Sequence, residues 1–160
     1  MTSALAHSPV EIVRLLLVAG GQAADPDVVD PNGIPTGKFP AYNTVEPDVP
    51  DACITVQGST GQSDGRDMDS GALNTHYGIQ LRIRARDSVE GFNKAQSLRT
   101  WISESVYQAL VTANEGGLIG TYNVNNFSKI GDVNELGVDA PSSKRWLYTI
   151  NCFISVRQIS

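Results

Sequence analysis

Long hydrophobic runs are scarce in this sequence, and their scarcity excludes a membrane-spanning helix. The longest apolar run, residues 15–19, is far too short to cross a bilayer, which takes about 20 apolar residues. The N-terminus has no basic stretch followed by a cleavable apolar segment, so we expect the chain to be made and folded inside the cell. We therefore expect no membrane partner.

Histidine and cysteine are also rare, which removes the usual nucleophiles, bases and soft metal ligands. Cys53 and Cys152 each lie in an apolar, strand-like run without the spacing of a metal or redox motif, and we expect them to be buried and reduced. His7 and His76 have no Ser, Cys or carboxylate at a catalytic spacing, and we expect both at the surface or in loops. Neither Gly-x-Ser-x-Gly nor a phosphate-binding Gly-rich loop is present. The sequence therefore predicts no catalytic residues, no metal and no cofactor.

Charge is sparse and uneven. The 160 residues suit a single domain over 1–160, with a net charge of −5. Residues 20–75 carry nine acids against two bases, whereas residues 76–160 carry nine bases against seven acids. Because phosphate neutralisation supplies most of the affinity for nucleic acid, an acidic chain is a poor general binder of DNA. Such a surface instead suits DNA that slides past without sticking.

Two helices are predicted. Ser8, Pro9 and Glu11 form a capping signal for a helix that ends at Gly20, and the Glu11 side chain is expected to return the hydrogen bond to the cap. A second helix is expected over 88–112, capped by Asp87 or Ser88, with an apolar stripe along one face and a stop at Asn114 and the two following glycines.

The intervening residues 22–50 hold six of the eight prolines, so we expect an irregular segment with at most a short edge strand over 41–45. A partner contact and a solvated excursion are both open for this segment.

The strand pattern completes an α+β fold. Strands are predicted over 52–57 and 79–86, separated by a long Gly-, Ser- and Asp-rich loop over 58–75. Further strands are expected over 119–124, 127–133 and 146–156. The resulting order, α-β-β-α-β-β-β, predicts a mostly antiparallel sheet with two helices packed on one face.

Two charged groups are candidate interfaces with a subunit or partner. The first is the loop that contains Asp64, Arg66, Asp67 and Asp69. Asp67 and Asp69 could instead offer oxygen ligands to a hard cation such as Ca²⁺, although the bidentate Glu of a calcium loop does not follow at the required distance.

The second candidate is the basic row of Arg82, Arg84 and Arg86, on one face of the predicted strand 79–86. Because the rest of the chain is acidic, we favour a contact with another subunit for this row. A solvated face and a phosphate contact are the alternatives.

Four segments in order resemble the tail terminator, or minor capsid, proteins of long-tailed bacteriophages. They are the Pro-x-x-Pro-Asp turn and strand at 47–56, the loop at 61–66, the strand at 78–86, and the following helix with Ala95 and Gln96. Before Pro47, where that family has a short aromatic strand, only Phe39 and Tyr42 represent it. The role of residues 22–46 is therefore not carried over from the resemblance.

The resemblance implies a virion structural protein that forms a ring, commonly hexameric, at the head-proximal end of the tail tube. Its expected partners are further copies of itself, the tail tube protein, the head-tail connector or stopper, and DNA passing through the lumen without sequence-specific binding. We expect it in the neck region of the virion after synthesis in the host cytoplasm. Another neck protein, such as a head-tail stopper or adaptor, is one alternative, and a small metal-dependent enzyme using Asp67 and Asp69 is another.

Overall fold

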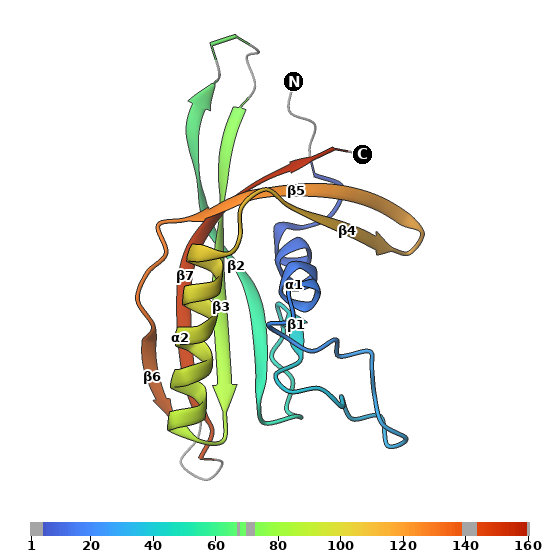
Figure 1. Ribbon diagram of the computed structural model, residues 1–160, viewed down its shortest axis with the longest axis vertical. Helices are drawn as coiled ribbons and strands as arrows, with labels where there is room; N and C mark the ends of the chain where they lie inside the picture. Colours follow the sequence, from blue (N-terminus) through green and yellow to red (C-terminus); the bar gives the residue numbers. More distant parts are fainter. Residues whose placement is uncertain (1–4, 67, 70–72, 139–143, 160) are drawn as a thin grey trace.

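One strongly twisted sheet carries two helices on one of its sides (Figure 1). The computed structural model describes residues 5–66, 68–69, 73–138 and 144–159. The helices are α1 (Pro9–Ala19) and α2 (Ser88–Glu104), and the strands are β1 (Ala41–Asn43), β2 (Cys53–Arg66), β3 (Leu73–Ala85), β4 (Ala109–Glu115), β5 (Leu118–Ser128), β6 (Asn134–Val138) and β7 (Trp146–Gln158). The predicted α+β class is confirmed.

The strand order differs from the prediction. The strands lie in the order β1-β2-β3-β7-β5-β4, and β6 pairs with the first residues of β7 while β5 pairs with the last. β1 runs parallel to β2, so the sheet is mixed, with antiparallel pairing elsewhere. The predicted edge strand near residue 41 is present as β1. β4 and β6 were not predicted.

Both helices pack on the same core. Ile79, Leu81 and Ile83 of β3 alternate along the strand, are fully buried, and share one hydrophobic cluster with α1 and α2. Tyr148 and Ile150 of β7 continue this face, as the alternation in the last predicted strand indicated. The other face of β3 carries the three arginines, because successive side chains of a strand point to opposite sides.

Helix α1 begins as predicted, but the Glu11 side chain makes other hydrogen bonds than the one predicted. The Ser8 hydroxyl accepts a hydrogen bond from the Glu11 backbone N–H at 3.2 Å, and Pro9 occupies the first turn. The Glu11 carboxylate binds Arg14 and Asn43 rather than returning to the cap. Burial raises the pKa of Glu11, but the hydrogen bonds from Arg14 and Asn43 outweigh burial and leave the pKa below its ordinary value.

Helix α2 is shorter than predicted and ends at Glu104. The prediction was wrong for residues 105–112 because Val111 and Ala113 face the core from a strand, while Leu110 is 65% exposed. The two glycines expected to stop the helix form a two-residue hairpin turn, with φ of 61° at Gly116 and 86° at Gly117.

The prediction of a loop over 58–75 was also wrong, since most of the residues in this range that the structure describes form strands. β2 and β3 pair from Cys53↔Arg84 to Arg66↔Leu73, with two register shifts on the way. The resulting hairpin extends well beyond the helices in Figure 1. The sequence misled because Gly and Ser are poor strand formers, and an exposed ribbon shows no apolar alternation.

The proline-rich segment follows a defined path along the edge of the sheet. Isolated bridges join Ala24 to Pro40 and Val29 to Pro35. The Asp30 carboxylate accepts hydrogen bonds from the Asn32 and Ile34 backbone N–H groups and closes a turn. Its last part, residues 44–52, crosses to the face of the sheet opposite the helices, where it meets the arginine row.

Candidate functional site

The arginine row is held by the preceding turn of its own chain. The Arg84 guanidinium donates to the backbone carbonyls of Asp51 at 2.9 Å and Pro50 at 2.8 Å, and also to that of Pro47. Its side chain is 2% exposed, and a Glu46 carboxylate oxygen lies 3.6 Å away. We call this arrangement, residues 46–51 closed around Arg84, the arginine clamp. Arg84 therefore cannot reach another subunit from this position.

The flanking arginines are paired as well. Arg82 lies 3.2 Å from Glu46, and Arg86 lies 2.9 Å from Asp51, which also lies 3.8 Å from Arg145. Among the three arginines of the row, Arg86 has the most exposed side chain, at 76%. A subunit contact therefore stays a prediction for Arg82 and Arg86, each of which already has an acidic partner within the chain.

The acidic part of the predicted interface lies elsewhere. Arg66 ends β2 and Asp69 lies in the turn after it, at the tip of the β2–β3 hairpin, whereas Asp67 and the side chain of Asp64 lie outside the described residues. This tip and the arginine clamp are at opposite ends of the molecule (Figure 1). The structure does not bring the two predicted groups together. Within the described residues, no group of three His, Cys, Asp or Glu side chains could hold a metal ion.

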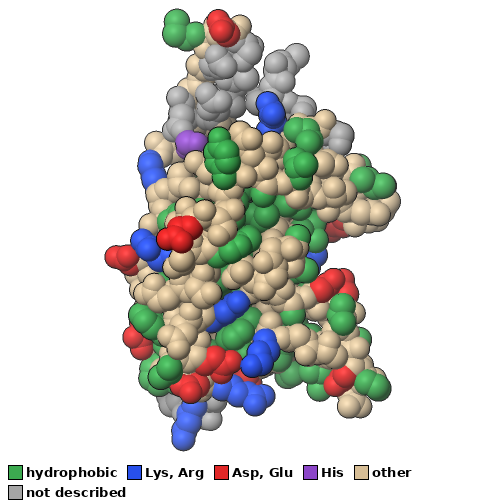
Figure 2. All heavy atoms as spheres, viewed as in Figure 1, with side chains coloured by type: hydrophobic (Ala, Val, Ile, Leu, Met, Phe, Trp, Pro, Cys, Tyr) green, Lys and Arg blue, Asp and Glu red, His purple; other side chains and the backbone are tan. Residues whose placement is uncertain are grey.

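Charges of both signs gather at the end of the molecule opposite the hairpin tip, as Figure 2 shows. The residues 46–51 and the arginines that bind them belong to this end. The four arginines share two carboxylates, Glu46 and Asp51, so their arrangement fixes a turn on the sheet without cancelling all of the positive charge.

His7 lies in the loop before α1, in agreement with the predicted surface or loop position, but its side chain is buried. Its Nδ1 lies 2.6 Å from the Tyr122 hydroxyl, which also accepts the His7 backbone N–H at 3.0 Å, and its Nε2 lies 3.1 Å from the Leu118 carbonyl oxygen. These contacts join the segment before α1 to β5. No sequence signal indicated them, since the partners are more than a hundred residues away.

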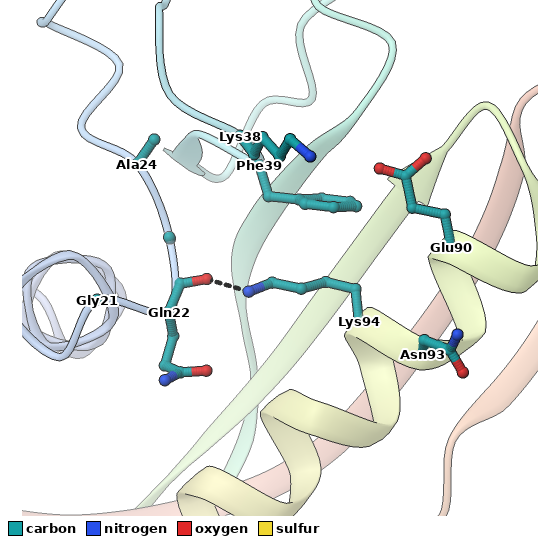
Figure 3. Close-up of a pocket in the computed structure, with 9 residues that line it drawn as sticks. Gly21, Gln22, Ala24, Lys38, Phe39, Glu90, Asn93 and Lys94 are labelled. Carbon is teal, nitrogen blue, oxygen red and sulfur yellow. Dashed lines mark hydrogen bonds between the residues drawn. The ribbon is translucent and has the colours of Figure 1, made fainter.

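A pocket of about 660 Å³ opens between α2, residues 21–24 and Phe39 (Figure 3). The Lys94 ammonium donates to the Gln22 carbonyl and lies 5.6 Å from the centroid of the Phe39 ring. Burial lowers the pKa of Lys94. Glu90 and Lys38 stand at the rim. The contacts of Lys94 tie α2 to the irregular segment.

The two cysteines are free and buried, as predicted. Burial raises the pKa of the Cys53 thiol to about 11 and that of the Cys152 thiol to about 12. Thiols with such pKa values are almost fully protonated at neutral pH and are poor nucleophiles. They act as small core side chains.

No helix among the described residues is long and apolar enough to span a membrane. No protein-family model matches the sequence, and no characterised protein compared with it is similar enough to indicate a family. The likeness to tail terminators therefore depends on the four segments in the sequence and on how they meet in the fold.

Proposed function

We propose that the protein is a tail terminator: a virion structural protein that forms a ring, hexameric by resemblance, at the head-proximal end of a phage tail tube. In this role it ends tube polymerisation and joins the tail to the head connector, while DNA passes through the lumen.

One observation carries the proposal. The resembling turn at 47–51 and the resembling strand at 78–86 are separate in sequence, yet Arg84 of the strand binds the carbonyls of the turn. Two segments that carry the resemblance but lie apart in the sequence therefore form one structural unit, and this supports the resemblance.

The proposal is tested with the purified protein and its cognate tail tube protein. We expect negative-stain images to show rings, and we expect the rings to bind one end of preformed tubes and stop their growth. A head-tail stopper or adaptor would instead bind the connector and leave tube growth unchanged. Unlimited tube growth in an excess of the protein would reject the terminator role.

The metal-dependent alternative has its own measurement. A calcium titration would raise the thermal unfolding midpoint if Asp67 and Asp69 bound the ion, because a ligand that binds only the folded state stabilises it. We expect no shift. A saturable shift that Asp69→Asn abolishes would favour the metal site over a purely structural loop.

A further inference from the structure

The hairpin formed by β4 and β5, here called the wing, leaves one backbone edge without a partner. β4 pairs with β5 without a register shift from Ala109↔Val124 to Glu115↔Leu118, and a two-residue turn joins them. In such a hairpin the residues flanking the turn form a hydrogen-bonded pair, and bonded and non-bonded pairs then alternate. The backbone N–H and C=O groups of Leu110, Thr112 and Asn114 therefore point outward, away from β5.

This edge lacks the features that usually block edge-to-edge pairing. β4 contains no proline, no lysine and no bulge, and Leu110 on its outer face is 65% exposed. No backbone hydrogen bond from another described segment reaches the outward groups of β4. Figure 2 shows few charged side chains over this part of the surface. The edge is available for another strand.

The distal part of the β2–β3 hairpin, here called the arm and comprising 59–66 and 73–76, extends past the strands that flank it in the sheet. β1 pairs with β2 only as far as Val56, and β7 pairs with β3 only from Tyr77. No described side chain of the arm belongs to the hydrophobic core. A two-stranded ribbon by itself is at best marginally stable in water, so an arm of this length gains stability from a partner.

We propose that the outer edge of β4 in one copy pairs with the arm of the next copy, which continues the sheet across the subunit boundary. The inference rests on the proposed ring and identifies its interface. Main-chain hydrogen bonds supply the affinity in this mode of recognition, which suits an arm rich in Gly and Ser. A second copy is the occupant because each chain carries both elements, the outer edge of β4 and an arm that extends past its flanking strands.

The directions of the two elements agree with a ring. In Figure 1 the arm and the wing point away from the body in different directions. Laying the arm of one copy along the wing of another therefore rotates the second copy relative to the first. Head-to-tail contacts form a ring where the rotation closes and an open filament where it does not, whereas a two-fold dimer would use the same patch on both copies.

Crosslinking tests which surfaces meet. We would coexpress differently tagged copies carrying Thr112→Cys on the wing and Ser63→Cys on the arm, and treat them with a short bismaleimide. The native thiols are buried, so the unmodified protein gives the background. We expect a crosslinked dimer that contains both tags, and none from either variant alone. Equal crosslinking of Thr112→Cys with itself would overturn the proposal in favour of β4–β4 pairing.

Two further variants test whether the contact drives assembly. Thr112→Pro removes an outward N–H without breaking the β4–β5 ladder, and Thr112→Val is its control, since it keeps that N–H. In a shortened arm, an Asn-Gly turn replaces residues 63–75 between the paired positions Gln62 and His76. We expect both changes to raise the dissociation constant of the oligomer by at least about tenfold in sedimentation velocity, with Thr112→Val unchanged.

The outcomes separate this inference from the proposed function. If both the Thr112→Pro variant and the shortened-arm variant still form rings, the edge contact is wrong while the terminator role stands. If the contact forms but the rings do not stop tube growth, the interface stands and the terminator role fails. Should Thr112→Pro unfold, the shortened arm and the crosslinking still decide the question.

Discussion

At the scale of single residues, Arg84 has the largest structural role among the charged side chains. Five hydrogen-bonding sites on a rigid planar group let one guanidinium bind several carbonyls at once, which a lysine ammonium does less well. Arg84 donates hydrogen bonds to the backbone carbonyls of Pro47, Asp48, Pro50 and Asp51. Without Arg84 the Pro47, Pro50 and Asp51 carbonyls would lose this donor, whereas the Asp48 carbonyl would keep Arg145 at 3.0 Å.

We therefore predict a large effect of Arg84→Met on stability. The substitution leaves the Pro47, Pro50 and Asp51 carbonyls without their guanidinium donor, whereas Glu46 keeps Arg82, so the free energy of unfolding should fall by about 3 kcal/mol in urea denaturation. Arg86→Met is the matched control, because its exposed pair with Asp51 is worth less than about 1 kcal/mol. Similar losses for the two variants would mean that the clamp is not a distinct structural unit.

The burial of Arg84 also decides which arginine variant can test assembly. From the sequence, reversal of Arg82 and Arg84 to Glu was expected to impair assembly more than folding. Since Arg84 is 2% exposed, that double variant buries one new carboxylate and places a second, partly exposed one beside Glu46, so it tests folding instead. Arg86→Glu is the variant that tests a surface role for the row.

The buried thiols predict how stability depends on pH. In the unfolded chain a cysteine deprotonates near pH 9, whereas in the folded chain Cys53 and Cys152 keep their protons to about 11 and about 12. Raised folded-state pKa values give stability that is complete below pH 9 and is lost as the pH rises towards these values. Each thiol should lower the free energy of unfolding by about 1.4 kcal/mol per pH unit in that window.

Urea denaturation at several pH values from 8 to about 10.5 would measure this slope. Cys152→Ala should remove its share of the slope, even though the loss of packing lowers stability at every pH. An unchanged slope in that variant would show that Cys152 is not protected by burial. The comparison is needed because other groups titrate in the same range.

At the scale of elements, the approach of α2 to the sheet depends on Gly91. A Cβ atom added there would lie 2.6 Å from a ring carbon of Tyr148 and 3.2 Å from the Ala85 side chain. Alanine favours a helix over glycine by about 1 kcal/mol, but overpacking at a buried contact costs about 1–3 kcal/mol.

We predict that Gly91→Ala lowers the thermal midpoint in spite of its better helix propensity. Ser97→Ala, on the exposed side of the same helix, changes propensity without a new contact and should leave the midpoint unchanged or slightly raised. A rise for Gly91→Ala would mean that α2 shifts away from Tyr148 at little cost.

At the scale of the whole molecule, the proposed interface predicts a weak dependence of assembly on salt. The arm and the wing would meet through backbone hydrogen bonds, whereas contacts between the acidic region 20–75 and the basic row would be ion pairs that salt screens. Raising NaCl from about 0.05 M to about 0.5 M should therefore change the oligomer fraction little in sedimentation velocity. Dissociation at high salt would favour the charged surfaces instead.

Whether the sequence predicts a structural feature depends on how far apart in the chain the residues that determine it lie. The cap at Ser8, the start of α2 at Asp87 and the alternation along β3 are local, and the structure confirms all three. The α+β class follows from them. The buried cysteines were also expected, because each lies in an apolar run.

Tertiary structure alone decided the rest. The stretch after Glu104 has apolar spacing that fits a helix, but it is a strand because Val111 and Ala113 bury against α1 only in that form. Likewise, the sequence marks Arg84 as one of three alternating arginines, and only the fold of residues 46–51 over the sheet turns it into a buried anchor. Local patterns record what a residue prefers, whereas burial depends on which distant segment comes to cover it.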